Sequence, residues 1–269
     1  MSPVEPILSD DDITLWNAWR KTFAVHATTS GFRRRVDSAK KLIASLNPGL
    51  KKCVMWSAGK DSTAMLHLIC VEMGIKTPVV SEKDDLDYPG EHEYTKRLAE
   101  QWGLDLEIIT PKLSPLAYLR GAGLEADCDV HSRKSGLSKA CFYNLVEESN
   151  KRFDLIFLGI RAAESAHRKA LREFRSRLYT IKNGETKCIP IADWTGLDVY
   201  AYIESRGIEI MPVYKCIGLM HREEPWRIRK SWWLPGSHGR HGGVAWLRRY
   251  YPSLWQTHCE LFRNTDLIS

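Results

Sequence analysis

Short apolar runs alternate along the chain with amphipathic stretches whose apolar positions lie three and four residues apart. The runs predict strands and the amphipathic stretches predict helices. The predicted strands are residues 51–56, 77–81, 104–109, 153–158 and 187–191. The predicted helices are residues 13–25, 32–46, 61–73, 88–102, 136–150, 162–174 and 195–206. Residues 111–133, with two prolines and two glycines, predict a long loop. Strands that alternate with helices form βαβ units, so the pattern indicates an α/β fold with a parallel sheet.

Composition adds little to this fold class but excludes several others. The chain has 269 residues, of which 43% are hydrophobic and 27% charged, as in ordinary globular proteins. No apolar run is long enough for a membrane span. The first residues are acidic and lack the features of a signal peptide. Because no apolar run could span a membrane, we expect no membrane partner. The seven cysteines include no Cys-x-x-Cys pair, so we expect a cytoplasmic protein with free thiols.

Charge is concentrated at the C-terminal end. The net charge is +6, and residues 214–269 contain nine Lys or Arg against four Asp or Glu, together with five of the ten tryptophans. We therefore predict three parts: an N-terminal helical extension (1–30), an α/β domain (31–214) and a basic, Trp-rich extension (215–269).

The strongest chemical signal follows the first predicted strand, where Ser57-Ala58-Gly59-Lys60-Asp61-Ser62-Thr63 leads into a helix. A strand–turn–helix passage presents backbone N–H groups and the positive end of a helix dipole to an anion. Gly59 permits close approach of a phosphate, and Lys60 adds a positive charge. Hydrogen-bond donors come from the hydroxyls of Ser57, Ser62 and Thr63. Asp61 would be repelled by phosphate unless a cation lies between them, so we interpret it as a Mg²⁺ ligand. The spacing is not that of a Walker A loop. The alternative is a helix start capped by Ser and Asp.

The segment Ser57-x-Gly-Lys-Asp-Ser62 resembles the PP-loop of the ATP pyrophosphatases, also called adenine nucleotide α-hydrolases. The wider run 54–68 is similar to the small subunit of bacterial ATP sulfurylase, which belongs with the phosphoadenosine phosphosulfate (PAPS) reductases. Three later segments agree with this resemblance, which covers about residues 30–214: they are residues 84–91, 159–165 and 190–203. The resemblance implies a Rossmann-like, HUP-type sheet of about five strands in the order 3-2-1-4-5, with helices on both faces.

In open parallel sheets, ligands bind at the carboxyl ends of the strands where the strand order reverses. With the implied order, the PP-loop after the first strand and Arg161 after the fourth would both line that crevice. Arg161 can bind phosphate or sulfate oxygens with its forked guanidinium. The alternative is a surface arginine paired with Glu164. Arg168 belongs to a basic helix face, which could equally be a solvated surface.

These considerations give two sets of candidate residues. The catalytic candidates are Lys60, Asp61 and Arg161, with Asp61 also the metal ligand. The nucleotide-binding candidates are Ser57, Ala58, Gly59, Ser62, Thr63, Asp84, Asp85, Gly159, Glu164 and Arg168.

The resemblance implies an enzyme that binds ATP and Mg²⁺, cleaves the bond between the α and β phosphates, adenylates an acceptor and releases pyrophosphate. The acceptor would be a small oxyanion or a nucleic acid, and a partner subunit is expected from the sulfurylase resemblance. A PAPS or adenylylsulfate reductase is the first alternative. It needs a reactive cysteine, and Cys259 in His-Cys-Glu-Leu does not match the reductase motif. The cysteine set of an iron–sulfur enzyme is also missing, so we expect no cluster.

The second alternative is an enzyme that modifies nucleic acid, of the tRNA thiolation or DNA phosphorothioation type. Its support is the extension 215–269, where basic residues interleaved with Trp and Tyr suit phosphate contact and base stacking. The candidate contacts are Arg227, Arg229, Lys230, Trp232, Trp233, Arg240, Arg248 and Arg249. The opposing interpretation is an extension that packs its aromatic side chains on the core. A metal set of Cys128, His131 and Cys141 lacks a fourth ligand and is weak.

Overall fold

A computed structural model describes residues 5–85, 87–121, 141, 151–174, 176–181, 184–217 and 242–261. Its centre is a six-stranded sheet in the order β3-β2-β1-β4-β6-β5. The strands are β1 (Lys52–Met55), β2 (Val79–Glu82), β3 (Leu106–Ile109), β4 (Leu155–Leu158), β5 (Leu178–Thr180) and β6 (Thr186–Cys188). Every pairing is parallel except that of β5 with β6.

The predicted order 3-2-1-4-5 is confirmed for the five parallel strands, since the fifth predicted strand is β6. The prediction missed β5, which pairs antiparallel with β6 at the edge of the sheet. This hairpin turns near Gly184, whose φ of 91° is easy only for glycine. A strand of three residues at a sheet edge has too few positions to show a clear alternation, so the sequence pattern could not reveal it.

Helices precede, connect and follow the strands. They are α1 (Asp10–Ala27), α2 (Ser30–Ala44), α3 (Lys60–Leu66) continued by the π-helix η1 (His67–Glu72), α4 (Glu91–Gln101), α5 (Pro115–Gly121), the 3-10 helix η6 (Ala162–Glu164), α7 (Ala166–Phe174), α8 (Gly196–Ser205), the 3-10 helix η7 (Pro212–Lys215), α9 (Gly242–Tyr250) and α10 (Pro252–Leu261). The prediction of a loop over 111–133 is wrong where α5 forms. The predicted helix 136–150 lies, apart from Cys141, outside the described residues.

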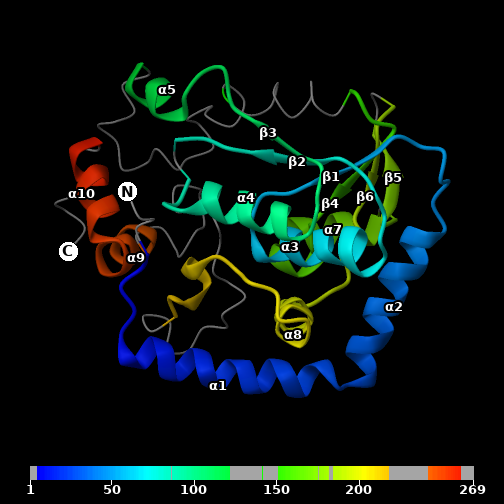
Figure 1. Ribbon diagram of the computed structural model, residues 1–269, viewed down its shortest axis with the longest axis horizontal. Coiled ribbons are helices and arrows are strands. Elements are labelled where there is room, and N and C mark those ends of the chain that lie inside the picture. The colour runs from blue at the N-terminus through cyan, green and yellow to red at the C-terminus, as the bar shows by residue number, and fades with distance from the viewer. Residues whose placement is uncertain are drawn as a thin grey trace.

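The helices form layers beneath and above the sheet. Figure 1 shows α3 and α4 on one side of the sheet and α5 on the other. On the first side α8 packs against α3, and α1 packs against α8. Phe23 of α1 is fully buried and stacks on Tyr200 of α8 with ring centroids 4.8 Å apart. The N-terminal helix therefore contributes to the main core, while the division into three domains stays a prediction.

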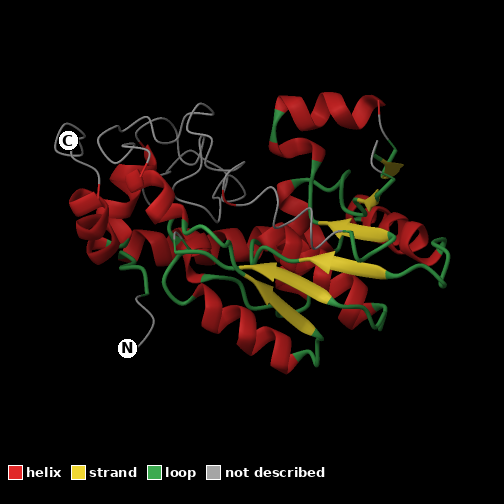
Figure 2. Ribbon diagram, turned by 90° about the horizontal axis from the view of Figure 1, so that it is seen from above, coloured by secondary structure: helices red, strands yellow, loops and turns green. Residues whose placement is uncertain are grey.

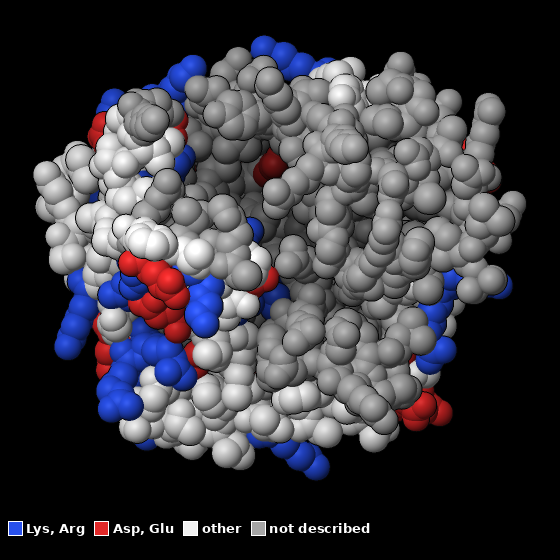
Figure 3. Space-filling view, turned by 180° about the vertical axis from the view of Figure 1, so that it is seen from behind, with Lys and Arg blue, Asp and Glu red and all other residues white. Residues whose placement is uncertain are grey.

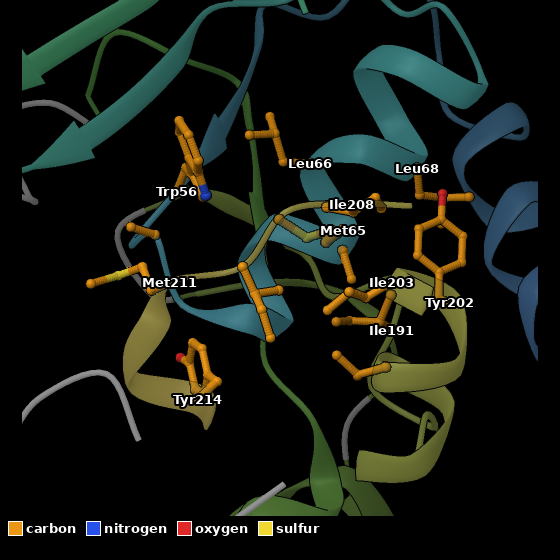
Figure 4. Close-up of a cluster of buried hydrophobic side chains, with 14 of the residues drawn as sticks. Trp56, Met65, Leu66, Leu68, Ile191, Tyr202, Ile203, Ile208, Met211 and Tyr214 are labelled. Atoms are coloured by element: carbon orange, nitrogen blue, oxygen red, sulfur yellow. The ribbon is translucent and has the colours of Figure 1, made fainter. Parts of the chain in front are cut away.

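The main core lies between the sheet and these helices (Figure 4). Met65 of α3 lies toward Ile203 of α8, whereas Leu66 lies on the side of Trp56, and all of these side chains are buried. Figure 2 shows the arrowheads of the strands pointing to the end of the molecule where α9 and α10 lie. The carboxyl ends of the parallel strands and the C-terminal helices thus share one end of the molecule. No helix in the described part of the chain is both long and apolar enough to span a membrane.

Candidate functional site

The PP-loop, residues 57–62, joins the carboxyl end of β1 to the start of α3. Ala58 has φ of 55°, in the left-handed region that residues with a Cβ enter at a cost. Gly59 is the N-cap of α3 and supplies no side-chain cap to the helix. The chain thus places a strained residue directly before a helix start that Gly59 itself cannot cap. Both features are typical of a loop shaped for a ligand rather than for stability alone.

Serine hydroxyls hold the loop in this shape. The Oγ atoms of Ser57 and Ser62 lie 3.0 Å apart, and Ser62 Oγ donates to the carbonyl of Gly59 over 2.9 Å. Thr63 differs from the two serines, because its fully buried hydroxyl accepts a 2.9 Å hydrogen bond from the indole of Trp56. This hydrogen bond ties the loop to the core, and a phosphate contact from Thr63 stays a prediction.

A buried cluster of charges lies at the first turn of α3. Asp61 Oδ2 is 2.9 Å from Lys60 Nζ, and Asp61 Oδ1 is 2.5 Å from Arg161 Nε. Arg161 is 2% exposed and Lys60 is 4% exposed. Burial opposes ionisation of Asp61, but the charges of Lys60 and Arg161 outweigh it and hold the pKa of this carboxyl below its usual value. Two cations and one carboxylate thus lie together at this helix start, an arrangement that suits an anionic ligand.

Gly159 allows this cluster to form. A Cβ built on Gly159 would lie 2.5 Å from the Cα of Ser62, closer than real Cβ atoms approach. The end of β4 therefore runs directly against the first turn of α3, which only a glycine permits. This contact brings Arg161, two residues later, beside Asp61.

Glu164 shapes the turn that carries Arg161. Its carboxylate accepts the backbone N–H of Arg161 over 2.8 Å and also pairs with the guanidinium of Arg168. The alternative in which the Arg161 side chain pairs with Glu164 is wrong, since that side chain turns to Asp61. The side chain of Arg168 is half-exposed, and a nucleotide contact from it stays a prediction.

Asp84 and Asp85, which follow β2, form hydrogen bonds within the protein. The carboxylate of Asp85 accepts the hydroxyl of Ser114 and the backbone N–H of Leu116, and so holds the start of α5. Asp85 thus has a structural role at this helix start, and a nucleotide contact from it stays a prediction. The backbone N–H of Asp84 donates to the carboxylate of Asp87, and a ligand role for Asp84 stays a prediction.

One residue of the site escaped the sequence analysis. The hydroxyl of Tyr214 accepts the backbone N–H of Lys60 over 3.0 Å, although the two residues are 154 positions apart. The ring of Tyr214 also lies under the Lys60 ammonium, with Nζ 5.3 Å from the ring centroid. A buried tyrosine after a helix gives no sequence signal of such a contact.

Several cysteines in the described part of the chain are poor nucleophiles. Burial raises the pKa of the Cys53 and Cys188 thiols to about 12 and that of Cys70 to about 11, and it also raises that of Cys216. A thiol with a raised pKa carries little thiolate at neutral pH. Among the described residues, no group of three or more His, Cys, Asp or Glu is placed to hold a metal ion. Cys128 and His131 lie outside the described residues.

The C-terminal arm, α9 and α10 (residues 242–261), packs its large side chains inward. Trp246, Leu247, Tyr250 and Tyr251 are buried, and Trp246 Nε1 donates to the carbonyl of Cys216 over 3.2 Å. This part of the extension therefore follows the packed interpretation. Arg248 and Arg249 are exposed. The other candidate nucleic-acid contacts lie outside the described residues: Arg227, Arg229, Lys230, Trp232, Trp233 and Arg240. On the face drawn in Figure 3, the described Lys and Arg side chains are interspersed with Asp and Glu.

The chain is similar to enzymes that handle sulfated or adenylylated compounds. It is 25% identical over 185 residues to a phosphoadenosine 5'-phosphosulfate reductase of Aliivibrio salmonicida, covering 65% of this chain and 69% of the relative. It is 28% identical over 187 residues to sulfate adenylyltransferase subunit 2 of Vibrio atlanticus, covering 60% of this chain and 59% of the relative. The match thus spans well under two thirds of that subunit.

The fold also has solved counterparts. The crystal structure of the PAPS reductase of Candida auris matches with a TM-score of 0.50 and 14% identity, covering 76% of this chain and 90% of that one. At this identity the match concerns the fold alone. Residues 51–254 match the family described as the phosphoadenosine phosphosulfate reductase domain. This match covers the loop, Gly159 and the Lys60–Asp61–Arg161 cluster, and the chain therefore belongs to the phosphoadenosine phosphosulfate reductase domain family.

Proposed function

We propose that the protein is an enzyme that binds ATP with Mg²⁺ and cleaves the bond between the α and β phosphates. The adenylyl group passes to an acceptor, and pyrophosphate is released. The observation that carries this proposal is the buried cluster in which Lys60 and Arg161 flank Asp61 at the start of α3. Cationic side chains fixed in a buried site stabilise developing charge on a phosphoryl group without reorganisation.

The triphosphate would be held by the PP-loop. In the proposed complex Ser57, Gly59, Lys60 and Ser62 bind the β and γ phosphates. Without nucleotide, the carboxylate of Asp61 pairs with both cations and offsets part of their positive charge. Binding therefore exchanges partners: Lys60 turns to the β and γ oxygens, and Arg161 turns to the α phosphate or the acceptor. The gain in charge-assisted hydrogen bonds offsets the loss of the buried ion pairs.

The residues present fit a magnesium ion on one condition. Mg²⁺ is commonly held by one or two carboxylates together with substrate phosphates. Asp61 supplies such a carboxylate, but both of its oxygens contact cations in the free protein. Asp61 can hold Mg²⁺ only after Lys60 and Arg161 have turned to the phosphates. When bound, the ion would neutralise charge on the leaving pyrophosphate.

The acceptor class follows from the relatives and from the arm. Sulfate adenylyltransferase is named for transfer to sulfate, so we propose a small oxyanion as the acceptor and extend the proposal to a partner subunit. We do not extend it to nucleic acid, because Trp246, Tyr250 and Tyr251 of the arm are buried instead of available for stacking.

A reductase would need a reactive thiol. The relative named PAPS reductase keeps this alternative open, but burial raises the pKa of the Cys53, Cys188 and Cys216 thiols and disfavours it. Cys259 is only half-buried and is the described thiol to test. We expect alkylation of Cys259 to leave activity unchanged.

Calorimetric titration and pyrophosphate exchange test the proposal. We expect Lys60→Ala to weaken binding of Mg²⁺–ATP about a hundredfold and to abolish exchange of labelled pyrophosphate into ATP, since charge-assisted contacts to phosphate are lost. Lys51→Ala is the matched control, because it removes the same charge from an exposed position near β1. Equal ATP affinity in the Lys60→Ala variant and the wild type would refute the assignment of the loop.

A further inference from the structure

Tyr214 contacts both ends of Lys60. Its hydroxyl accepts the backbone N–H of Lys60 over 3.0 Å, and its ring lies 5.3 Å from the Lys60 ammonium. The first contact fixes the backbone at the first residue of α3. The second places an aromatic face beside the charge, an attraction that strengthens where water is excluded.

The hydroxyl matters because a helix start has N–H groups without partners within the helix. Lys60 is buried, so an unmatched N–H there would cost free energy. The Tyr214 hydroxyl removes that cost without occupying the loop between Ser57 and Gly59. Burial, together with the nearby charge of Asp61, raises the pKa of Tyr214 well above its usual value. Tyr214 therefore stays neutral across the physiological range and does not compete with phosphate for Lys60 as an anion would.

Tyr214 is itself held rigidly. It lies on η7, where Pro212 is at the start and the neighbouring Met211 and Val213 are buried. Figure 4 shows Tyr214 projecting from η7 beside Met211, next to the chain that enters α3. Two residues later, the carbonyl of Cys216 accepts the indole N–H of Trp246 in the C-terminal arm. The position of the Tyr214 hydroxyl is thus fixed from both sides.

We infer that Tyr214 is a positioning residue for recognition of the triphosphate, acting through Lys60. This inference rests on the proposed function. Because Lys60 serves the β and γ phosphates, Tyr214 governs the affinity for ligands that carry them and leaves the affinity for AMP unchanged. A residue that only stabilises the fold would alter both affinities or neither.

Titration of the full-length protein with Mg²⁺–ATP and with AMP tests this. We expect Tyr214→Phe, which keeps the ring, to weaken ATP binding about tenfold, the equivalent of one hydrogen bond. Tyr214→Leu also removes the ring and should weaken ATP binding about fiftyfold. AMP affinity should stay within about twofold in both variants. Tyr202→Phe is the matched control: it removes another buried hydroxyl, which donates to Glu72 over 2.6 Å. It should lower the unfolding temperature and change neither affinity.

The outcomes separate the inference from the function on which it rests. If Lys60→Ala binds ATP as the wild type does, the proposed function fails. If ATP binding depends on Lys60 but is unchanged or tighter in Tyr214→Phe, the positioning role is refuted. An equal loss of ATP and AMP affinity in folded Tyr214→Phe also refutes it, since the residue would then support the fold only. Tyr214→Phe changes the shape and volume of the side chain little. If Tyr214→Phe nevertheless folds poorly, the affinities of Tyr214→Leu provide a second measurement.

Discussion

The PP-loop site and the C-terminal arm lie at the same end of the molecule and are both buried, but by different means. At the site the buried side chains are charged, and Asp61 is matched by Lys60 and Arg161. In the arm the buried side chains are mostly aromatic, and the polar atoms of Trp246 and Tyr250 have structural partners. Tyr250, for example, donates to Asp12 of α1 over 2.7 Å.

The difference shows what burial means in each place. Buried ion pairs contribute little net stability, because removing charges from water costs about as much as their attraction returns. Keeping two cations on one carboxylate is therefore typical of a binding site. Burial of apolar area stabilises the fold at roughly 25 cal/mol per Å². Substitutions in the arm should then reduce stability and spare ligand binding, whereas substitutions at the site should reduce ligand binding.

The largest loss of stability is expected from Leu247→Ala in the arm. Leu247 is fully buried, and truncating such a side chain leaves a cavity that costs about 3 kcal/mol. Denaturant unfolding should show this loss, while the folded variant binds Mg²⁺–ATP with wild-type affinity. Arg248→Ala, at the exposed neighbouring position, should change neither. Weaker ATP binding by folded Leu247→Ala would mean that packing within the arm also sets the site, for example through the Trp246–Cys216 hydrogen bond near Tyr214.

An intermediate loss of stability is expected from Gly159→Ala. This substitution should reduce both stability and ligand binding, because it alters the site through packing. The new Cβ would meet Ser62 at 2.5 Å, and the strain should cost about 2 kcal/mol of unfolding free energy. Since β4 must move away from α3, Arg161 leaves Asp61 and ATP affinity falls as well. Gly31→Ala is the control, because its nearest neighbour is an Arg35 atom 3.8 Å away. Wild-type ATP affinity in Gly159→Ala would contradict this account of the glycine.

The smallest effect is expected at the far end of the α3–η1 helix. Burial raises the pKa of Glu72, but hydrogen bonds from Arg206, Lys40 and Tyr202 outweigh it and lower the pKa to about 2. A depressed carboxyl pKa stabilises the fold above the unfolded value near 4.5, and this contribution is lost as the pH falls toward 2. As the pH falls over that range, the unfolding free energy of the wild type should therefore drop by about 1.5 kcal/mol more than that of Glu72→Gln. This figure allows for the partial exposure of Glu72.

ATP binding at neutral pH should be unaffected in Glu72→Gln, because the charge lies away from the loop. Glu93→Gln, at an exposed position of α4, is the control and should keep the wild-type acid profile. If the unfolding free energy of Glu72→Gln fell with pH as that of the wild type does, the ionised Glu72 carboxylate would contribute nothing to stability.

Much of the fold was predictable because its signals are local. The apolar runs gave the five parallel strands, and the loop from Ser57 to Thr63 identified the site from contiguous residues. What failed also failed for local reasons. The short strand β5 has too few residues to show a period, and the loop prediction over 111–133 followed prolines and glycines where Pro115 in fact begins α5.

The sequence by itself determined the parallel α/β architecture, the strand–loop–helix passage at Gly59 and the residue types available for phosphate. Only the tertiary structure decided which of these meet. It placed Arg161 on Asp61, 100 positions away, and Tyr214 on the N–H of Lys60. It also assigned Thr63 and Asp85 to structural hydrogen bonds and turned Trp246 inward. The physical reason is that periodicity and propensity act over a few residues. The partner of a buried polar group depends instead on chain segments that only folding brings together.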